Sequence, residues 1–498
     1  MTHLLAAFLA GLASACAFEP LGLGPFMAFG FAVLLWLLSR AQGMRSALAL
    51  GWVFGFGQFA LGFNWIATAF TFQSAMPASL GWVAVVLLAA YLAVYPAMAA
   101  GLAWRYASGN PLRLGLILAA SWLVTEWLRG RMFTGFAWNP AGVALLPTPL
   151  AQLSPFIGTY GLSALAVLMG AVYFLAISPR IAARRQAAWL VLGFAGTLGA
   201  GLLLDRPAPA GTRLARIVQP NIGQQNKHDP AFDEETYARL TALTGKPADA
   251  PRLVFWPEAA IPDFLEDEPG ARRRLARLLG PGDVLVTGGT AIERDRLNAP
   301  IGGRNSLFIL TPDEALRGRY DKSHLVPYGE YLPARPILSA IGLSRLVPGD
   351  LDFWPGPGPR SLPIPGSFTR MGVQICYEIV FSGEVVDRND RPDFLFNPSN
   401  DAWFGAWGPP QHLAQAQLRA IEEGIPVIRS TPTGISAVID ARGHLRASLR
   451  WHTAGRIDSI IPGALPPTPF ARYGNLLSFL FAFALVAAAW FARVRERP

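Results

Sequence analysis

Three residues with complementary chemistry, Glu258, Lys322 and Cys376, each lie where a β-like run breaks into a loop. The segments that contain them are LVFWPE, GRYDKSHLVPYGE and MGVQICYE. A carboxylate can accept a proton, an ammonium group can stabilise an oxyanion, and a thiol can act as a nucleophile. Acyl transfer needs these three functions. Because all three residues lie in the one long stretch without a predicted membrane span, the pattern indicates acyl chemistry beside a lipid bilayer.

Each of these residues also has an ordinary structural interpretation. A lone cysteine is most often a small buried hydrophobe, and Glu258 could be a plain surface residue. Lys322 could simply pair with Asp321, and an exposed ion pair of that kind contributes little to stability. If Glu258 is instead partly desolvated at the end of its strand, burial would raise its pKa towards a value useful for a base. Only the joint pattern favours catalysis.

The composition indicates that lipid surrounds much of the chain. Of the 498 residues, 52% are hydrophobic and 15% are charged, whereas about a quarter of a soluble domain is charged. The formal charge of +9 could indicate nucleic-acid binding. The arginines, however, cluster in short loops between apolar runs, which is a pattern of membrane topology. Zinc-type spacing, phosphate-binding loops and dinucleotide motifs are missing from the sequence, so we expect no metal, no cofactor and no nucleic-acid partner.

Eight apolar runs approach the roughly 20 residues that a spanning helix needs, although the first two are short. They are Leu4–Phe18, Pro25–Leu38, Ala47–Ile66, Leu80–Trp104, Leu114–Leu128, Gly161–Ile177, Ala187–Leu204 and Leu476–Phe491. Arginines follow every second run, whereas the first and third loops contain neither Lys nor Arg. The positive-inside rule therefore predicts that both termini are cytoplasmic and that residues 205–475 lie outside.

After Gly211 the composition changes to short β-rich runs separated by helix-like stretches. The expected strands are Leu214–Gln219, Leu253–Trp256, Val284–Thr287, Ser306–Leu310, Gly372–Ile375, Phe394–Asn397, Val427–Ser430 and Ser436–Ile439. The expected helices are Asp233–Leu243, Gly270–Leu279 and Gln411–Glu423. Such a mixture indicates a layered α/β domain. We therefore predict a seven-helix transmembrane domain (1–204), a catalytic domain (205–475) and a last transmembrane helix with a cytoplasmic tail (476–498).

The motifs resemble a known family. WPE around Glu258, YDKxHLVPYGEYLP around Lys322 and CYE around Cys376 resemble the Glu-Lys-Cys triad of the nitrilase, or carbon–nitrogen hydrolase, superfamily. The flanking apolar runs and the sequence GRYDKSHLVPYGEYLP narrow the resemblance to the bacterial apolipoprotein N-acyltransferases. This resemblance implies a nitrilase-like α-β-β-α sandwich on the periplasmic side of the inner membrane, attached to a polytopic helical domain.

The resemblance also implies a reaction. An acyl chain would pass from a phospholipid to the α-amino group of the N-terminal diacylglyceryl-cysteine of an apolipoprotein, the last step of lipoprotein maturation. Glu258 would act as the base, Cys376 would hold the chain as a thioester, and Lys322 and the backbone N–H of Tyr377 would bind the oxyanion. The thioester stores the energy needed for amide formation, so neither ATP nor a metal is required. We expect a monomer whose partners are the phospholipid donor, the apolipoprotein acceptor and membrane lipid.

Further residues match family positions around this triad. The resemblance implies that Glu330 orients Lys322 and keeps it protonated, and that Tyr377 and Glu378 shape the pocket. Asn305 and Arg429 match family positions without a specified role, and each could equally be a strand-end hydrogen bonder. His228 stands where the family usually has tryptophan, which leaves less apolar surface for an acyl chain.

Apolar residues should crowd the route from bilayer to thiol. Aromatic side chains on glycine-bearing loops suit a lid at the interface; the candidates are Trp354, Trp403, Phe404 and Trp407, with Leu343–Val347 as a further element. Trp403 and Phe404 could equally pack inward as core. In the predicted fifth span, Glu126 and Arg129 are spaced to pair with each other, and contact with a lipid headgroup is the alternative.

Two other functions compete with acyl transfer. A membrane-tethered amidase of the nitrilase type would use the same triad but pass the thioester to water. A transporter or assembly scaffold with an inactive outer domain belongs to a different class. The intact triad argues against a scaffold, and the predicted membrane frame favours a transferase over a hydrolase.

Overall fold

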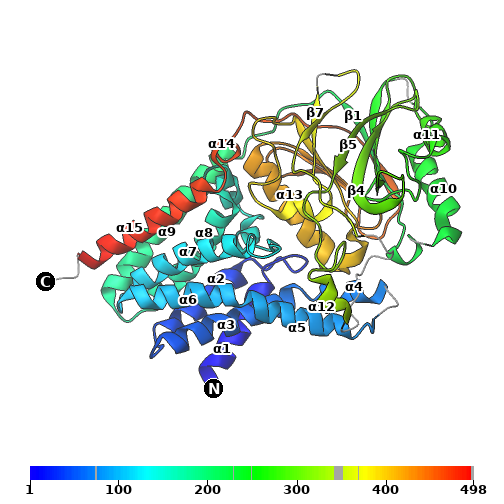
Figure 1. The fold of residues 1–498 in the computed structure, drawn as a ribbon. Coiled ribbons are helices and arrows are strands. Elements are labelled where there is room, and N and C mark those ends of the chain that lie inside the picture. The colour runs from blue at the N-terminus through cyan, green and yellow to red at the C-terminus, as the bar shows by residue number, and fades with distance from the viewer. Residues whose placement is uncertain (73–75, 228, 248–249, 341–351, 368, 495–498) are drawn as a thin grey trace.

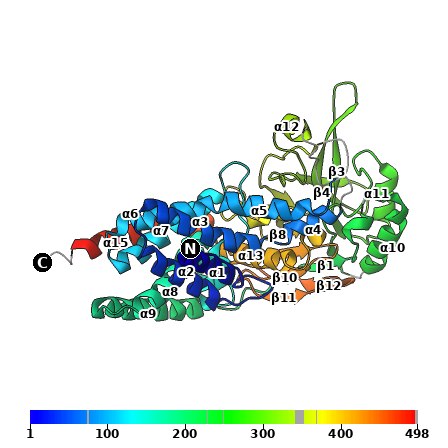
Figure 2. The ribbon, with the colours of Figure 1, turned by 90° about the horizontal axis from the view of Figure 1, so that it is seen from below.

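The computed structural model describes residues 1–72, 76–227, 229–247, 250–340, 352–367 and 369–494. These residues form a bundle of apolar helices with an α/β sandwich beside it (Figures 1 and 2). The first half of the chain builds the bundle and the second half builds the sandwich, except that the C-terminal helix returns to the bundle (Figure 1).

All eight apolar runs are helical. The helices of the bundle are α1 (Thr2–Ala15), α2 (Pro25–Leu38), α3 (Met44–Gly62), α4 (Ile66–Ala69), α5 (Leu80–Leu92), α6 (Val94–Ala107), α7 (Pro111–Arg129), α8 (Ser154–Ala176), α9 (Ile181–Leu204) and α15 (Leu476–Val494). Short 3₁₀ turns η1 (Phe70–Phe72), η2 (Ala141–Leu145) and η3 (Pro149–Leu153) and helix α14 (Pro469–Tyr473) connect them. Although α15 is far away in sequence, it packs against α7 and α8.

The predicted count of eight spans is not confirmed. Within the described residues, four helical segments are long and apolar enough to cross a membrane, and the bent pair Met44–Gly62 and Ile66–Phe72 could form a fifth. Helices α1 and α2 have 14 residues each. A helix of that length rises about 21 Å, which is less than the roughly 30 Å of a hydrocarbon core. The structure therefore supports a membrane domain without a definite number of spans.

Small residues allow these helices to approach closely. A Cβ atom added at Gly51 of α3 would lie 2.6 Å from the carbonyl oxygen of Pro96 on α6, and one at Gly55 would lie 2.6 Å from the Pro96 ring. Neither position has room for a larger side chain. The pair thus sets the α3–α6 contact, as small residues commonly do between membrane helices.

Two six-stranded sheets form the sandwich. The first has the order β12-β1-β2-β3-β4-β5 and the second has the order β11-β10-β9-β8-β7-β6. The strands of the first sheet are β1 (Leu214–Gln219), β2 (Arg252–Phe255), β3 (Val284–Arg294), β4 (Pro300–Leu310), β5 (Leu316–Asp321) and β12 (Gly455–Ile460). Those of the second are β6 (Ser361–Pro363), β7 (Arg370–Val373), β8 (Phe394–Pro398), β9 (Val427–Ser430), β10 (Ala437–Ile439) and β11 (Leu445–Ser448).

Alternating side chains fill two separate layers of core. Ile217 and Phe255 point towards the second sheet, where Phe255 lies 4.6 Å from Phe396 between ring centroids. Their neighbours Val218 and Val254 belong to the core beneath α10 (Asp233–Thr244) and α11 (Pro269–Ala276). This period of two is expected for strands buried on both faces. Helix α13 (Gly408–Glu423) packs on the second sheet, which completes an α-β-β-α sandwich; a short helix α12 (Arg335–Ala340) lies in a loop.

Helix α13 also joins the sandwich to the helical bundle. Gln411 accepts a hydrogen bond from the indole of Trp138 at 2.8 Å, and Glu422 accepts bonds from the backbone and hydroxyl of Thr159 at 2.5 and 2.7 Å. All four of these side chains are buried. The contact therefore includes hydrogen bonds between buried polar groups and not only apolar surface.

Candidate active site

The two sheets bring Glu258, Lys322 and Cys376 together at one edge of the sandwich. Glu258 follows β2, Lys322 follows β5 directly, and Cys376 begins a 3₁₀ turn, η6 (Cys376–Val380), after β7. All three side chains are buried. Cys376 lies close enough to Glu258 for each group to shift the pKa of the other, and Lys322 Nζ lies 3.5 Å from Glu258 Oε1.

A second carboxylate and an amide complete the polar cluster around Lys322. Lys322 Nζ lies 3.0 Å from the Glu330 carboxylate. Asn305 Nδ2 bridges the two acids, because it donates to Glu258 Oε1 at 2.7 Å and to Glu330 Oε1 at 2.8 Å. The alternative pairing of Lys322 with Asp321 is wrong, since Asp321 accepts hydrogen bonds from Ser306 and Arg319 instead.

The backbone holds Cys376 in an unusual conformation. Its φ angle is +52°, in the left-handed region that non-glycine residues rarely adopt. The carbonyl oxygen of Cys376 accepts hydrogen bonds from Asn397 Nδ2 at 3.3 Å and from His412 Nε2 at 3.1 Å. Strained backbone of this kind persists only where its surroundings over-determine it, and it is concentrated at functional sites.

The environment of the cluster shifts the pKa values of Glu258 and Cys376 in opposite directions. Burial alone would raise the pKa of Glu258, but Lys322, Lys227 and the hydrogen bond from Asn305 together lower it below its usual value. The predicted rise in the pKa of Glu258 is therefore wrong, because the neighbouring cations outweigh desolvation. Burial and the Glu258 carboxylate raise the pKa of Cys376 to about 12. In the resting site the carboxylate is ionised and the sulfur keeps its proton.

Lys322 remains a cation despite its burial. Desolvation would lower its pKa, but the Glu330 and Glu258 carboxylates reverse that effect and raise the pKa above the usual value for lysine. A permanently charged ammonium in a buried site is suited to stabilise an oxyanion.

Lys227 is a further residue of the cluster, and the sequence analysis did not single it out. Its Nζ donates to the carbonyl oxygen of Glu258 at 2.9 Å. Burial lowers the pKa of Lys227 to about 8, against the opposing pull of Glu258 and Cys376. The motif QPNIGQQNKHDP, which contains Lys227, was the only signal that could have identified it.

Glu378 and Tyr377 hold the turn after the nucleophile. Glu378 accepts hydrogen bonds from the backbone N–H of Ile375 at 2.7 Å, from Ser323 and from the Tyr320 hydroxyl. Glu378 therefore ties the Cys376 turn to the segment that follows Lys322. Tyr377 stacks on Trp138 of the helical bundle with 6.3 Å between ring centroids.

Arg429 lies on the backbone side of Cys376, near the groups that bind its carbonyl oxygen, and not beside the thiol. It donates to Asp401 at 2.6 and 2.7 Å, and His412 Nδ1 contacts the same carboxylate at 2.9 Å. His412 in turn donates to the Cys376 carbonyl. Arg429 also contacts His412 Nδ1 at 3.0 Å and donates to Asn397 Oδ1, so it supports the Cys376 turn through the two groups that bind the Cys376 carbonyl.

The candidate lid residues occupy different environments. Phe404 is buried 4.8 Å from Trp65 and 5.3 Å from Trp138 (ring centroids), so it packs as core. Trp403 and Trp407 are partly buried, and Trp354 is 38% exposed over the Gly302 backbone. His228 and the segment Leu343–Val347 lie outside the described residues.

Glu126 and Arg129 pair as the simpler sequence interpretation predicted. Both side chains are buried, and their nearest charged atoms are 3.9 Å apart. Glu126 also accepts hydrogen bonds from Ala141 N at 2.9 Å and from the Trp122 indole, so the pair braces the loop after α7.

Comparisons with known proteins agree with this architecture. Residues 10–172 match the family model of the apolipoprotein N-acyltransferase N-terminal domain, and residues 214–464 match the carbon-nitrogen hydrolase model. The chain is 39% identical to an apolipoprotein N-acyltransferase of Bradyrhizobium diazoefficiens, over 99% of this chain and 95% of that one. It is 38% identical to one of Caulobacter vibrioides, over 98% and 94%, and 36% identical to one of Rhodopseudomonas palustris, over 99% and 95%.

Proposed function

The chain belongs to the apolipoprotein N-acyltransferase family and N-acylates lipoproteins, and from this premise we propose that Cys376 is the residue that holds the acyl chain. One observation carries the assignment: the buried Cys376 lies beside an ionised carboxylate, Glu258, which in turn lies 3.5 Å from a buried cation, Lys322. Nucleophile, base and electrophilic stabiliser are thus neighbours in one buried cluster before any substrate binds.

In the first step, Glu258 takes the proton from Cys376 as the sulfur attacks an ester carbonyl of the phospholipid. Negative charge moves from Glu258 to the carbonyl oxygen, where Lys322 and the backbone N–H of Tyr377 stabilise it. One such donor is typically worth about 10²–10³ in rate. When the tetrahedral intermediate collapses, the ester C–O bond breaks, Glu258 returns the proton to the leaving oxygen, and a lysophospholipid departs.

In the second step, the α-amino group of the diacylglyceryl-cysteine of an apolipoprotein attacks the thioester. The C–N bond forms and the C–S bond breaks. Glu258 takes the amine proton and passes it to the departing sulfur. The products are an amide and the free thiol of Cys376, so acceptor and donor use one site in turn.

The neighbours have supporting roles in this proposal. Glu330 keeps Lys322 charged and oriented, and Asn305 lets two carboxylates share one ammonium group. Glu378 and Tyr377 hold the nucleophile's turn, and Arg429 braces it from behind. Trp403 and Trp407 line the approach from the bilayer, and Trp354 caps the far side.

The membrane arrangement is also proposed. Residues 1–204 form the transmembrane domain, 205–475 form the catalytic domain on the periplasmic side of the inner membrane, and 476–498 return to the cytoplasm. The distribution of arginine supports this orientation, because Arg105, Arg180 and Arg184 cluster where the basic loops of a cytoplasmic face would lie.

The test is the intact mass of the purified protein after incubation with phosphatidylethanolamine and no acceptor. We expect an added acyl mass on Cys376 that neutral hydroxylamine removes, together with released lysophospholipid. The Cys376→Ala variant should keep its fold and show neither product, because the role of the thiol is chemical. Lysolipid and free fatty acid without an adduct would indicate a hydrolase, and transfer by the Cys376→Ala variant would refute the mechanism.

A further inference from the structure

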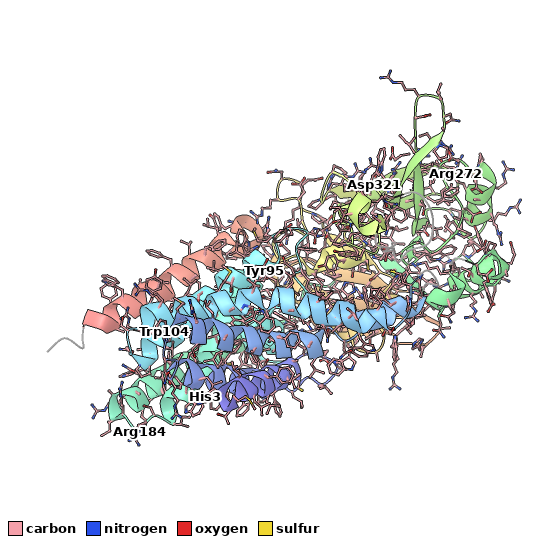
Figure 3. All side chains as sticks on the ribbon, turned by 60° about the horizontal axis from the view of Figure 1, so that its bottom comes forward. His3, Tyr95, Trp104, Arg184, Arg272 and Asp321 are labelled. Carbon is pink, nitrogen blue, oxygen red and sulfur yellow. The ribbon has the colours of Figure 1, made fainter. Side chains whose placement is uncertain are left out.

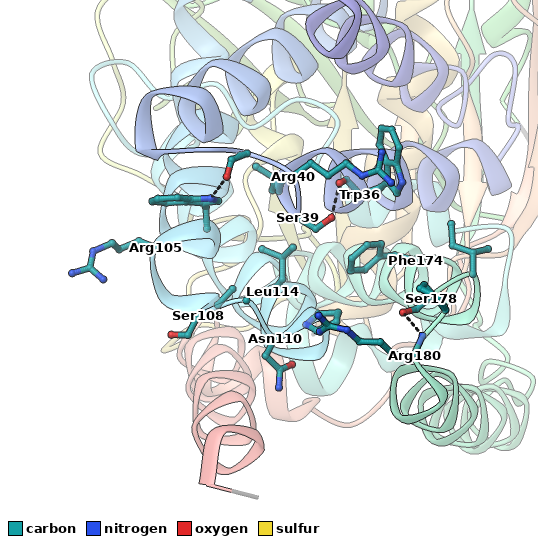
Figure 4. Close-up of a pocket in the computed structure, with 18 residues that line it drawn as sticks. Trp36, Ser39, Arg40, Arg105, Ser108, Asn110, Leu114, Phe174, Ser178 and Arg180 are labelled. Carbon is teal, nitrogen blue, oxygen red and sulfur yellow. Dashed lines mark hydrogen bonds between the residues drawn. The ribbon is translucent and has the colours of Figure 1, made fainter. Parts of the chain in front are cut away.

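A cavity of about 820 Å³ lies at the end of the helical bundle where α2, α6 and α8 finish and α7 begins. Trp36, Arg40, Trp104, Asn110 and Arg180 are among the residues that line it (Figure 4). This cavity has no part in the proposed reaction.

The cavity is far from the active site. Helix α7 begins at the cavity with Pro111 and ends at Arg129, beside the loop whose Trp138 stacks on Tyr377. Nineteen helical residues rise about 28 Å. Figure 3 shows the same separation, with Trp104 at the end of the bundle opposite to Asp321. A ligand here would not be the acyl donor in its reactive position.

Among the residues that the structure describes, no salt bridge joins a carboxylate to Arg40, Arg105 or Arg180 of the cavity. Residues 1–204 contain only two acidic residues, Glu19 and Glu126. Glu126 lies at the catalytic end of α7, and the backbone oxygen of Glu19 contacts Gln411 of the sandwich. The part of this end that residues 1–204 form is therefore basic, and an anion from outside the chain would meet no repulsion from it.

The lining combines basic side chains with an apolar wall, as a lipid-binding site does. Arg40 lies over the Trp36 ring, 3.8 Å from its centroid, and Arg180 points towards Asn110, whereas Arg105 points away (Figure 4). Leu114, Phe174 and Ile177 form an apolar wall. Tryptophans and arginines mark the headgroup level of a bilayer, and the apolar wall suits the glycerol and upper acyl region. A free anion would use only the charged half.

We propose that this cavity binds the phosphate-bearing headgroup of an anionic membrane lipid, with Arg40 and Arg180 as the charged contacts and Trp36 and Trp104 at the level of the headgroup. Basic pockets between helix ends commonly bind anionic headgroups, and each basic side chain adds to the attraction. Such a lipid would anchor the bundle in the membrane at the end remote from the chemistry. The proposal does not depend on the assignment of Cys376.

The experiment measures lipid binding to the full chain in detergent by native mass spectrometry. The protein contains Cys376→Ala, so no lipid is consumed. Phosphatidylglycerol and phosphatidylethanolamine are titrated into this protein, into Arg40→Gln/Arg180→Gln and into the matched control Arg184→Gln/Arg185→Gln. The control removes two charges from the same end of the bundle but leaves the cavity lining intact. Equal melting temperatures verify that all three proteins are folded.

We expect phosphatidylglycerol to bind about tenfold more weakly to the cavity variant and unchanged to the control, with little effect on phosphatidylethanolamine. An equal loss of phosphatidylglycerol affinity in both double variants would mean that the lipid is attracted diffusely to the basic end of the bundle. No loss of affinity in either variant would mean that the cavity is unoccupied. Both results overturn the proposal. In a separate competition, inorganic phosphate and glycerophosphoglycerol are each added to the protein with bound phosphatidylglycerol. If phosphate displaces the lipid as well as glycerophosphoglycerol does, the ligand is a free anion and the lipid assignment fails.

Discussion

At the scale of single residues, the site depends on the balance between two carboxylates and two ammonium groups. Glu258 and Glu330 are both within hydrogen-bonding distance of Asn305 Nδ2, and Lys322 lies between them. Lys227 adds the second positive charge beside Glu258. This arrangement outweighs burial at Glu258, whereas burial and the Glu258 carboxylate together keep the proton on Cys376.

Removing the amide bridge should change the acid side of the pH profile. The hydrogen bond from Asn305 lowers the pKa of Glu258, so Asn305→Leu should raise that pKa. A larger fraction of Glu258 is then protonated in acid and cannot act as the base. We expect lysophospholipid release at about pH 5 to slow by about tenfold, with a smaller loss at neutral pH. The exposed substitution Asn389→Ala should leave the profile unchanged, and an unshifted acid limb in Asn305→Leu would contradict this role.

The second carboxylate, that of Glu330, should affect the alkaline side of the pH profile of lysophospholipid release. Glu330 raises the pKa of Lys322 against the effect of burial. In Glu330→Gln the lysine should lose its proton at a lower pH, and a neutral amine stabilises an oxyanion poorly. The release rate should therefore fall as the pH rises through that lower pKa, in a range where the parent protein is still active. Quenched assays of lysophospholipid release across the alkaline range would detect this fall in rate. A uniform loss of rate at every pH would instead indicate a purely structural defect.

At the scale of elements, β8 and α13 hold the turn after β7 through hydrogen bonds, and β9 supports these two partners. Asn397 on β8 and His412 on α13 donate to the Cys376 carbonyl, and Arg429 on β9 pairs with Asp401 to support them. The burial of this cluster makes each partner depend on the others, because an uncompensated buried charge is costly.

Loss of Arg429 should therefore destabilise the sandwich. Its guanidinium group holds the pKa of Asp401 far below the usual range, so this pair stabilises the fold above the unfolded pKa of aspartate and the contribution is lost as the pH falls. Arg429→Met should lower the free energy of unfolding by about 3 kcal/mol at neutral pH, measured by denaturant unfolding. The exposed pair Arg317–Asp313 provides the control: Arg317→Met should leave the free energy of unfolding nearly unchanged. Similar losses in both variants would contradict a buried role for Arg429.

At the scale of the whole molecule, the sandwich rests on the bundle through α13 and the loop around Trp138. Glu422 bonds Thr159, and Trp138 contacts both Gln411 and Tyr377. The residue next to the nucleophile thus packs against the membrane domain. This arrangement places the turn that carries Cys376 beside the helical bundle.

The proposed orientation predicts which surfaces are accessible from outside the cell membrane. Leu297, at the tip of the β3–β4 hairpin, is 87% exposed, and Ser108 lies at the opposite end beside the lipid cavity. In a Cys16→Ser/Cys376→Ala background, Leu297→Cys in spheroplasts should react with a membrane-impermeant maleimide. Ser108→Cys should react only after permeabilisation. The reverse pattern would invert the proposed topology.

The strands that the sequence analysis found are the central ones of each sheet, where apolar residues form unbroken runs. The expected strands leave out β5, β6, β11 and β12, which are the edge strands of the two sheets, although a β-like run was expected directly before Lys322, where β5 lies. Their sequences, such as LRGRYD and GRIDSI, alternate charged and apolar residues because one face meets solvent. Edge strands therefore became visible only through their hydrogen-bonded partners.

The sequence by itself determined the family, the α/β class of the catalytic part and the triad, because these depend on local patterns and on residue types that chemistry cannot exchange. Only the tertiary structure decided the sign of the Glu258 pKa shift, the role of Lys227 and the inward packing of Phe404. Each of these depends on distances between segments far apart in the chain, such as the 2.9 Å from Lys227 to Glu258. Burial and neighbouring charge act through space, and one-dimensional spacing does not measure them.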